Sequence, residues 1–165
     1  MTDLDFLSPD LAAPDAVWRS PLERALAHAP DGIEDVSRTG VLEVRGDLSG
    51  LEPDGAELVQ LTPERALVLC AYEDAGGLRT RLAGDGRLVV DVSAGWAGLS
   101  LRGETALRRL SDLDPAALPA VGAVAHVQAL VLRDDAETFR IFFPQEFGHY
   151  VAEVVVDAVK GLDAP

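Results

Sequence analysis

Apolar side chains recur three or four residues apart at the C-terminal end of the chain, and this stretch constrains the fold more than any other. The stripe consists of Phe147, Tyr150, Val151, Val154, Val155, Ala158, Val159 and Leu162. Such spacing is typical of a helix that buries one face. Valine is a poor helix former by itself, so packing against another element must hold this helix in place.

Short apolar segments separated by turn residues supply a surface on which that helix can pack. We predict strands over residues 41–44, 58–61, 66–71, 88–92, 97–102, 123–132 and 138–143. The segment 66–71 is continuously apolar and short, as a fully buried strand is. Further helices are predicted over 20–29, 73–83 and 103–110, and the first begins with Ser20-Pro21-Leu22-Glu23, which has the residues of a capped helix start.

The order of these segments indicates an α+β fold. From residue 66 to residue 162 the order is strand, helix, strand, strand, helix, strand, strand, helix. This order predicts one mostly antiparallel sheet with helices packed on a face, and a ferredoxin-like core is a natural candidate. We predict no internal repeat.

Length and composition fit a single domain that follows an N-terminal arm. The chain has 165 residues, of which 48% are hydrophobic, and this is enough for a core. We interpret residues 1–19 as an irregular arm, 20–162 as one α+β domain and 163–165 as a tail. Because the arm carries Trp18 and other apolar residues, we expect part of it to pack either on its own domain or on another subunit.

The acidic charge balance excludes two classes of partner. The formal net charge is −14 at pH 7, so the surface repels phosphate backbones and anionic lipid headgroups. We therefore expect neither nucleic acid nor a membrane as a partner. The first residues are acidic and no apolar run approaches the roughly 20 residues that span a bilayer, so we expect a cytoplasmic protein.

No group of residues has the spacing of a catalytic, cofactor-binding or metal site. His28, His126 and His149 are scattered along the chain, and we expect His126 to be a strand residue. The single cysteine, Cys70, lies in an apolar stretch and is predicted to pack in the core. No glycine-rich phosphate loop is present, and the only lysine, Lys160, lies near the end of the last helix. We therefore predict no catalytic, cofactor-binding or metal-binding residue in this chain.

A series of weak motifs nevertheless extends through residues 20–162. It comprises Gly40-Val-Leu-Glu-Val-Arg-Gly46, Leu61-Thr-Pro-Glu-Arg-Ala-Leu-Val-Leu69, Val89-Val-Asp-Val-Ser93, Leu99-Ser-Leu-Arg-Gly103, Asp112-Leu-Asp-Pro115, Gly122-Ala-Val-Ala-His126, and Phe139-Arg-Ile-Phe-Phe143 leading to Phe147-Gly-His-Tyr150. In this order the chain resembles the gamma subunit of heterotetrameric sarcosine oxidase, as a divergent member. It is more distantly similar to the folate-binding domain of glycine-cleavage aminomethyltransferases.

The chain departs from that family's pattern at four places, one of which is a short connection between Gly122 and Phe139. Glu64-Arg65-Ala66 lacks the tryptophan that often stands there, and Ser111 lies near the place of a usual Cys-Pro step. Phe143-Pro144 replaces the basic pair that commonly precedes the last helix. These departures mark the chain as divergent.

The resemblance implies an aminomethyltransferase-like fold and a function. The chain would be a non-catalytic small subunit with a structural or assembly role in a flavin-dependent amine oxidase or dehydrogenase complex. It would hold no cofactor, while larger partner subunits would hold flavin, NAD and folate. Residues 88–103 would form the central strand pair of the sheet.

Three residues are candidates for contact with those larger subunits. They are Trp18, Arg19 and Trp96. For Trp96, a place in the core and a place facing a ligand are the alternatives.

Two other functions stay open at this stage. A stand-alone folate-binding or small-molecule-binding domain would have a cleft lined by Trp96 and Arg102. An independent hydrolase or transferase would need a nucleophile beside a base, and the sequence shows no such pair.

Overall fold

Two antiparallel sheets, and not one, form the framework of the molecule. The computed structural model describes residues 19–84 and 86–163. Sheet A has the strand order β1 (Ile33–Asp35), β6 (Trp96–Arg102), β9 (Thr138–Pro144), β8 (Val127–Arg133), β7 (Ala120–Val124). Sheet B has the order β3 (Glu57–Thr62), β4 (Arg65–Ala71), β2 (Thr39–Arg45), β5 (Leu88–Asp91). The predicted α+β class is confirmed, but the prediction of a single sheet is wrong.

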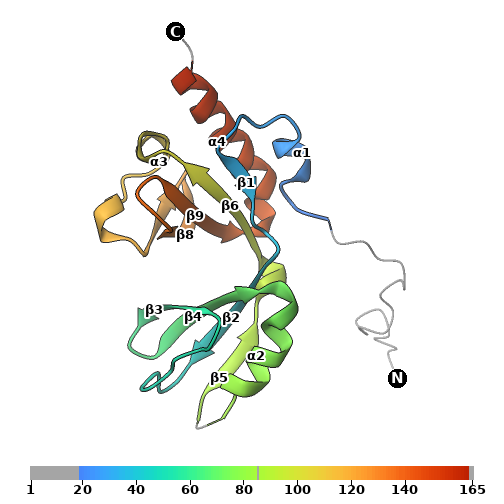
Figure 1. Ribbon diagram of the computed structural model, residues 1–165, viewed down its shortest axis with the longest axis vertical. Helices are drawn as coiled ribbons and strands as arrows, with labels where there is room; N and C mark the ends of the chain where they lie inside the picture. The colour runs from blue at the N-terminus through green and yellow to red at the C-terminus, as the bar shows by residue number, and fades with distance from the viewer. Residues whose placement is uncertain (1–18, 85, 164–165) are drawn as a thin grey trace.

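Helices cover the sheets, so the molecule consists of two lobes (Figure 1). Sheet A carries α1 (Glu23–Leu26), α3 (Glu104–Leu110) and α4 (Gly148–Asp163), and sheet B carries α2 (Ala75–Leu82). The predicted C-terminal helix is confirmed as α4, whose Val151 and Val155 are fully buried in the core of the sheet A lobe. Packing therefore holds this valine-rich helix, as its composition requires.

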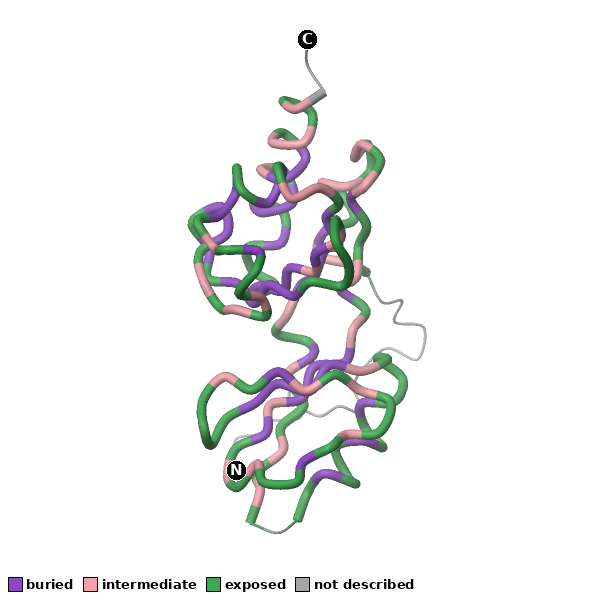
Figure 2. The backbone as a smooth tube through the Cα atoms, turned by 60° about the vertical axis from the view of Figure 1, so that its left-hand side comes forward, coloured by how far each residue is buried: buried purple, intermediate pink, exposed green. Residues whose placement is uncertain are grey.

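An apolar cluster fills the waist between the lobes. The cluster joins side chains of sheet B to side chains of sheet A: Val41, Val59, Leu67 and Leu69 on one side, Leu130, Leu132 and Phe142 on the other. Arg140 of β9 crosses the same interface and pairs with Glu57 of β3 at 2.6 Å. In Figure 2, buried stretches of both lobes border the waist. The two sheets thus share a core.

Within the described residues the chain crosses from one lobe to the other twice. The first crossing joins β1 to β2, and the second joins β5 to β6 through the short 3₁₀ turn η4 (Ser93–Gly95). The prediction that residues 88–103 form a central strand pair is therefore wrong. β5 is an edge strand of sheet B, whereas β6 lies between β1 and β9 in sheet A, because the small-residue bend carries the chain into the other sheet.

Both crossings contain the tripeptide Asp-Val-Ser and use it in the same way. Oδ1 of Asp35 accepts the backbone N–H of Ser37 at 2.9 Å, and Oδ1 of Asp91 accepts that of Ser93 at 3.0 Å. The Ser37 hydroxyl donates to the Gly98 carbonyl at 3.2 Å and accepts the Gly98 N–H at 3.1 Å. The Ser93 hydroxyl accepts the N–H of residue 41 at 2.9 Å and donates to Oδ1 of Asp91 at 2.6 Å. Each buried serine therefore binds the strand that leaves the other crossing.

These bonds relate two halves of an internal repeat, so the prediction that the chain has no repeat is wrong. The order β3-β4-β2-β5 corresponds to β8-β9-β6-β1. β2 and β6 share the same pattern of buried and exposed residues, and each ends before a glycine with positive φ, Gly46 or Gly103. β4 and β9 each lead through a 3₁₀ turn into a helix. The edge strands are exchanged, because β1 pairs with β6 and β5 pairs with β2.

The strand predicted over residues 123–132 is in fact two strands joined by a tight turn. Ala125 and His126 lie between the paired residues Val124 and Val127, with φ values of 48° and 64°. Positive φ at both central residues is typical of a type I′ hairpin turn, which favours Asn-Gly. Because Ala-His is not one of the favoured turn sequences, the sequence pattern predicts one continuous strand. His126 is accordingly exposed at a hairpin tip and is not a strand residue.

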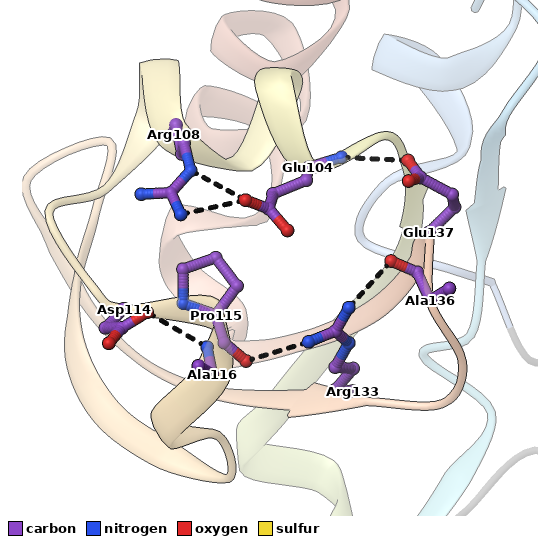
Figure 3. A network of polar contacts seen from close by, with 8 residues as sticks. All are labelled: Glu104, Arg108, Asp114, Pro115, Ala116, Arg133, Ala136 and Glu137. Atoms are coloured by element: carbon purple, nitrogen blue, oxygen red, sulfur yellow. Dashed lines mark hydrogen bonds and ion pairs between the residues drawn. The ribbon is translucent and has the colours of Figure 1, made fainter.

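Polar contacts tie the connection between α3 and β7 to sheet A (Figure 3). Arg133 of β8 donates to the carbonyl oxygens of Pro115, at 3.4 Å, and Ala136, at 2.9 Å. Oδ1 of Asp114 accepts the N–H of Ala116 at 3.0 Å and begins the 3₁₀ turn η5 (Pro115–Ala117). This proline-rich connection is therefore held against the sheet.

Replacing Ser93 by alanine is expected to destabilise the fold by about 1–3 kcal/mol, because the buried N–H of Val41 loses its hydroxyl partner. Urea unfolding followed by circular dichroism measures this change. Ser49→Ala is the matched control, since Ser49 is exposed and its replacement should change stability by less than about 0.5 kcal/mol. Equal stability of the two variants would contradict the role given to Ser93.

Replacing Gly98 by alanine is expected to cost about 1–3 kcal/mol. A Cβ at this position would lie 2.7 Å from two ring carbons of Phe142, which is buried between the sheets. Gly95→Ala is the control, because a Cβ there would have no heavy atom within 4 Å. Thermal unfolding of both variants tests this, and a Gly98→Ala protein as stable as the control would show that β6 and β9 do not pack so closely at this pair.

Candidate functional site

A small cavity of about 270 Å³ opens at the waist beside the second crossing. Its walls are formed by Arg19, Pro21, Ser37, Tyr72, Ser93, Ala94, Trp96 and Gln145, and we call it the waist cavity. Two of the three predicted contact residues, Arg19 and Trp96, thus line one cavity. The third, Trp18, lies outside the described residues.

Three 3₁₀ turns from distant parts of the sequence build the walls. Tyr72 begins η3 (Tyr72–Asp74) at the end of β4, Ala94 lies in η4, and Gln145 begins η6 (Gln145–Phe147) at the end of β9. The segment just before α1 packs against the start of α4. A Cβ on Gly148 of α4 would lie 2.9 Å from the Cβ of Pro21. The cavity therefore depends on the junction of both lobes, and no single segment of the sequence could have shown it.

Trp96 belongs partly to the core and partly to the cavity. The side chain is half-buried and packs against the apolar cluster between the sheets, while it also lines the waist cavity. The core and contact interpretations of Trp96 are thus compatible.

The waist cavity contrasts with the acidic charge of the whole chain. Among the described residues that line it, none carries a carboxylate, and Arg19 is the one charged side chain. The ring of Tyr72 is 40% exposed, and the guanidinium of Arg38 lies 6.0 Å from its centroid in a cation–π contact. Arg38 also pairs with Glu73 in the same turn. The site is aromatic and weakly cationic on a protein of net charge −14.

The described residues do not form the cleft that would join Trp96 to Arg102. Trp96 begins β6 and Arg102 ends it, and a strand of this length spans about 20 Å. Arg102 lines a separate cavity of about 600 Å³, where Glu34, Asp135 and Glu137 surround it with carboxylates. That expectation of the small-molecule hypothesis is therefore wrong.

The remaining candidate groups have structural surroundings. Cys70 is half-buried against the apolar cluster beneath α2, so the predicted packing is confirmed, although the side chain is not fully enclosed. Burial raises the pKa of the Cys70 thiol, and the carboxylates of Asp74 and Asp91 raise that pKa further. The thiol is therefore a weak nucleophile at neutral pH. His149 lies 3.2 Å from Glu153 of the same helix.

The described residues contain neither a candidate metal site nor a candidate membrane-spanning helix. Residues 19–84 and 86–163 contain no group of three or more His, Cys, Asp or Glu side chains placed to hold a metal ion. No helix in this part of the chain combines the length and apolar character needed to cross a membrane.

Similarity to known proteins is detected at the level of structure. No protein-family model matches the sequence, and no curated protein sequence matches it. A chain of heterotetrameric sarcosine oxidase from Corynebacterium sp. U-96 superposes with a TM-score of 0.72 and 19% identity, covering 91% of this chain and 98% of that chain. Aminomethyltransferase T of the glycine cleavage system from Bartonella henselae superposes with a TM-score of 0.54 and 17% identity over 82% of this chain. This chain spans about half of that enzyme, 48% of its length.

These superpositions show a shared fold. The sarcosine oxidase chain matches almost from end to end, so it is a chain of about the same length as this one. The expected aminomethyltransferase-like fold is confirmed. The chain therefore has the fold of a small chain of heterotetrameric sarcosine oxidase, which is also found in one half of an aminomethyltransferase.

Proposed function

We propose that this chain is a non-catalytic small subunit, of the gamma type, in a heteromeric flavin-dependent complex that resembles sarcosine oxidase. The observation that carries the proposal is the superposition on a chain of that heterotetramer over nearly the full length of both chains. Flavin, NAD and folate would be bound by the larger subunits in the cytoplasm.

The roles of the polar side chains support a structural function. Ser37 and Ser93 are buried and bind backbone groups at the waist. Cys70 has a raised pKa and packs on an apolar cluster. The Arg133 guanidinium fixes the connection before β7. These groups stabilise the fold, which is what a subunit with an assembly role requires.

The alternative is a stand-alone folate-binding or small-molecule-binding domain. The likeness to an aminomethyltransferase extends to only 48% of that enzyme. The two residues expected to line one binding cleft, Trp96 and Arg102, line separate cavities. We therefore favour the subunit over the separate binding domain.

Recovery of the chain from its native cells tests the proposal. With an affinity tag at the C-terminal end, beyond α4, the chain should co-purify with larger polypeptides and with flavin absorbance. An unrelated acidic protein with the same tag is the control for charge-driven capture. Recovery of a flavin-free monomer, from cells that are oxidising an N-methyl amino acid, would refute the proposed membership.

A second experiment separates a structural role from a catalytic one. We expect that omitting this chain during co-expression lowers the yield of assembled flavoprotein several-fold, while turnover per bound flavin in the remaining complex stays within about twofold of normal. Amine oxidation normalised to flavin content measures both effects. A loss of turnover per flavin at unchanged yield would assign chemistry to this chain instead.

A further inference from the structure

Aromatic residues form only 5% of the chain, and two of the described ones line the waist cavity. The three phenylalanines of β9 are fully buried in the lobes. Of the four other described aromatic residues, Tyr72 and Trp96 line the cavity, Phe147 belongs to the same 3₁₀ turn as the lining residue Gln145, and Tyr150 lines a different cavity. Tyr72 is 40% exposed and Phe147 is 43% exposed. Tyrosine, tryptophan and phenylalanine are enriched in protein interfaces, so this distribution marks a surface for a partner protein.

The size of the cavity limits what can fill it. Its volume of about 270 Å³ lies below the roughly 300–1,000 Å³ of typical small-molecule sites. A cavity of this size instead suits one inserted side chain, and interface energy is commonly concentrated in such anchors. Pro21, Trp96 and Ala94 offer it apolar surface.

The charge at the cavity determines which partner residues are favoured next to the inserted side chain. Arg19 is exposed and supplies the only charge among the lining residues that the structure describes, although the chain as a whole carries −14. A partner segment with a carboxylate next to its anchor would therefore be favoured here and repelled by most of the remaining surface.

The cavity is also held in shape before any partner arrives. Ser37 and Ser93 line it, and each is buried and fixed by hydrogen bonds to the backbone of a strand in the other crossing. A preformed site loses little conformational entropy on binding, which raises affinity.

We propose that the waist cavity receives one apolar anchor side chain from a larger subunit of the complex, and that an acidic residue beside this anchor pairs with Arg19. This inference rests on the proposed function, because the partner is a subunit of that complex.

Competition during assembly tests the inference with matched pairs of variants. The wild-type chain and one full-length variant are co-expressed with the larger subunits, and native mass spectrometry measures the ratio of the two in the assembled complex. Tyr72→Ala is compared with Tyr150→Ala, since these rings are 40% and 45% exposed but only Tyr72 lines the cavity. Arg19→Glu is compared with Arg24→Glu, because Arg24 is exposed on α1 outside the cavity.

We expect Tyr72→Ala and Arg19→Glu to be incorporated about tenfold less than wild type, and the two controls within about twofold. Thermal unfolding of each isolated variant should match wild type, since all four side chains are exposed. If wild type assembles and both cavity variants assemble as well as their controls, the inference is overturned while the proposed function stands. If wild type enters no flavin-containing complex, the proposed function fails and the inference fails with it.

Discussion

Two buried serine hydroxyls at the waist hold together the rest of the structure. Ser37 and Ser93 lie on the two crossings between the lobes, and the hydroxyl of each accepts a backbone N–H of the strand that follows the other crossing. Because these backbone groups are enclosed, leaving them without partners would cost free energy that the packing of the lobes would have to offset. These hydrogen bonds fix β2, which lies between β4 and β5 in sheet B, and β6, which lies between β1 and β9 in sheet A. It thereby sets the position of one lobe relative to the other.

The same junction creates the surface that we assign to a partner. Phe142 packs closely over Gly98 of the neighbouring strand and belongs to the apolar cluster between the sheets, against which Trp96 also packs. The turns that end β4 and β9 lie beside the second crossing and bring Tyr72 and Gln145 to the cavity. Stability and recognition therefore depend on the same few residues, which is consistent with a subunit whose role is assembly.

Local patterns predicted much of the fold, whereas relations between distant segments were hidden. The valine-rich stripe predicted α4, and the apolar run at 66–71 predicted β4, because burial of one face or of both faces leaves a mark on consecutive residues. The three-residue strand β1 was missed, since Ile33-Glu34-Asp35 is too short for a pattern. The bend at 93–95 indicated a turn but not the change of sheet, because a crossing and a hairpin use the same small residues.

The internal repeat shows the same limit. The two halves have similar sequences only near the crossings, in Asp-Val-Ser and in Leu-x-x-Arg-Gly. The loops and helices in the rest of each half differ in length. For the candidate site, Arg19 and Trp96 were predicted from their residue types, but Tyr72 and Gln145 were not. Nothing in their local sequence signals that β4 and β9 end at the same place.

Hydrogen–deuterium exchange of this chain, alone and within the purified complex, tests the central claim most directly. We predict that binding slows exchange chiefly in the three turns at residues 72–74, 93–95 and 145–147, which surround the waist cavity. Unchanged exchange in these turns, together with protection at the exposed hairpin tip of His126 or along the edge strand β5, would contradict the account.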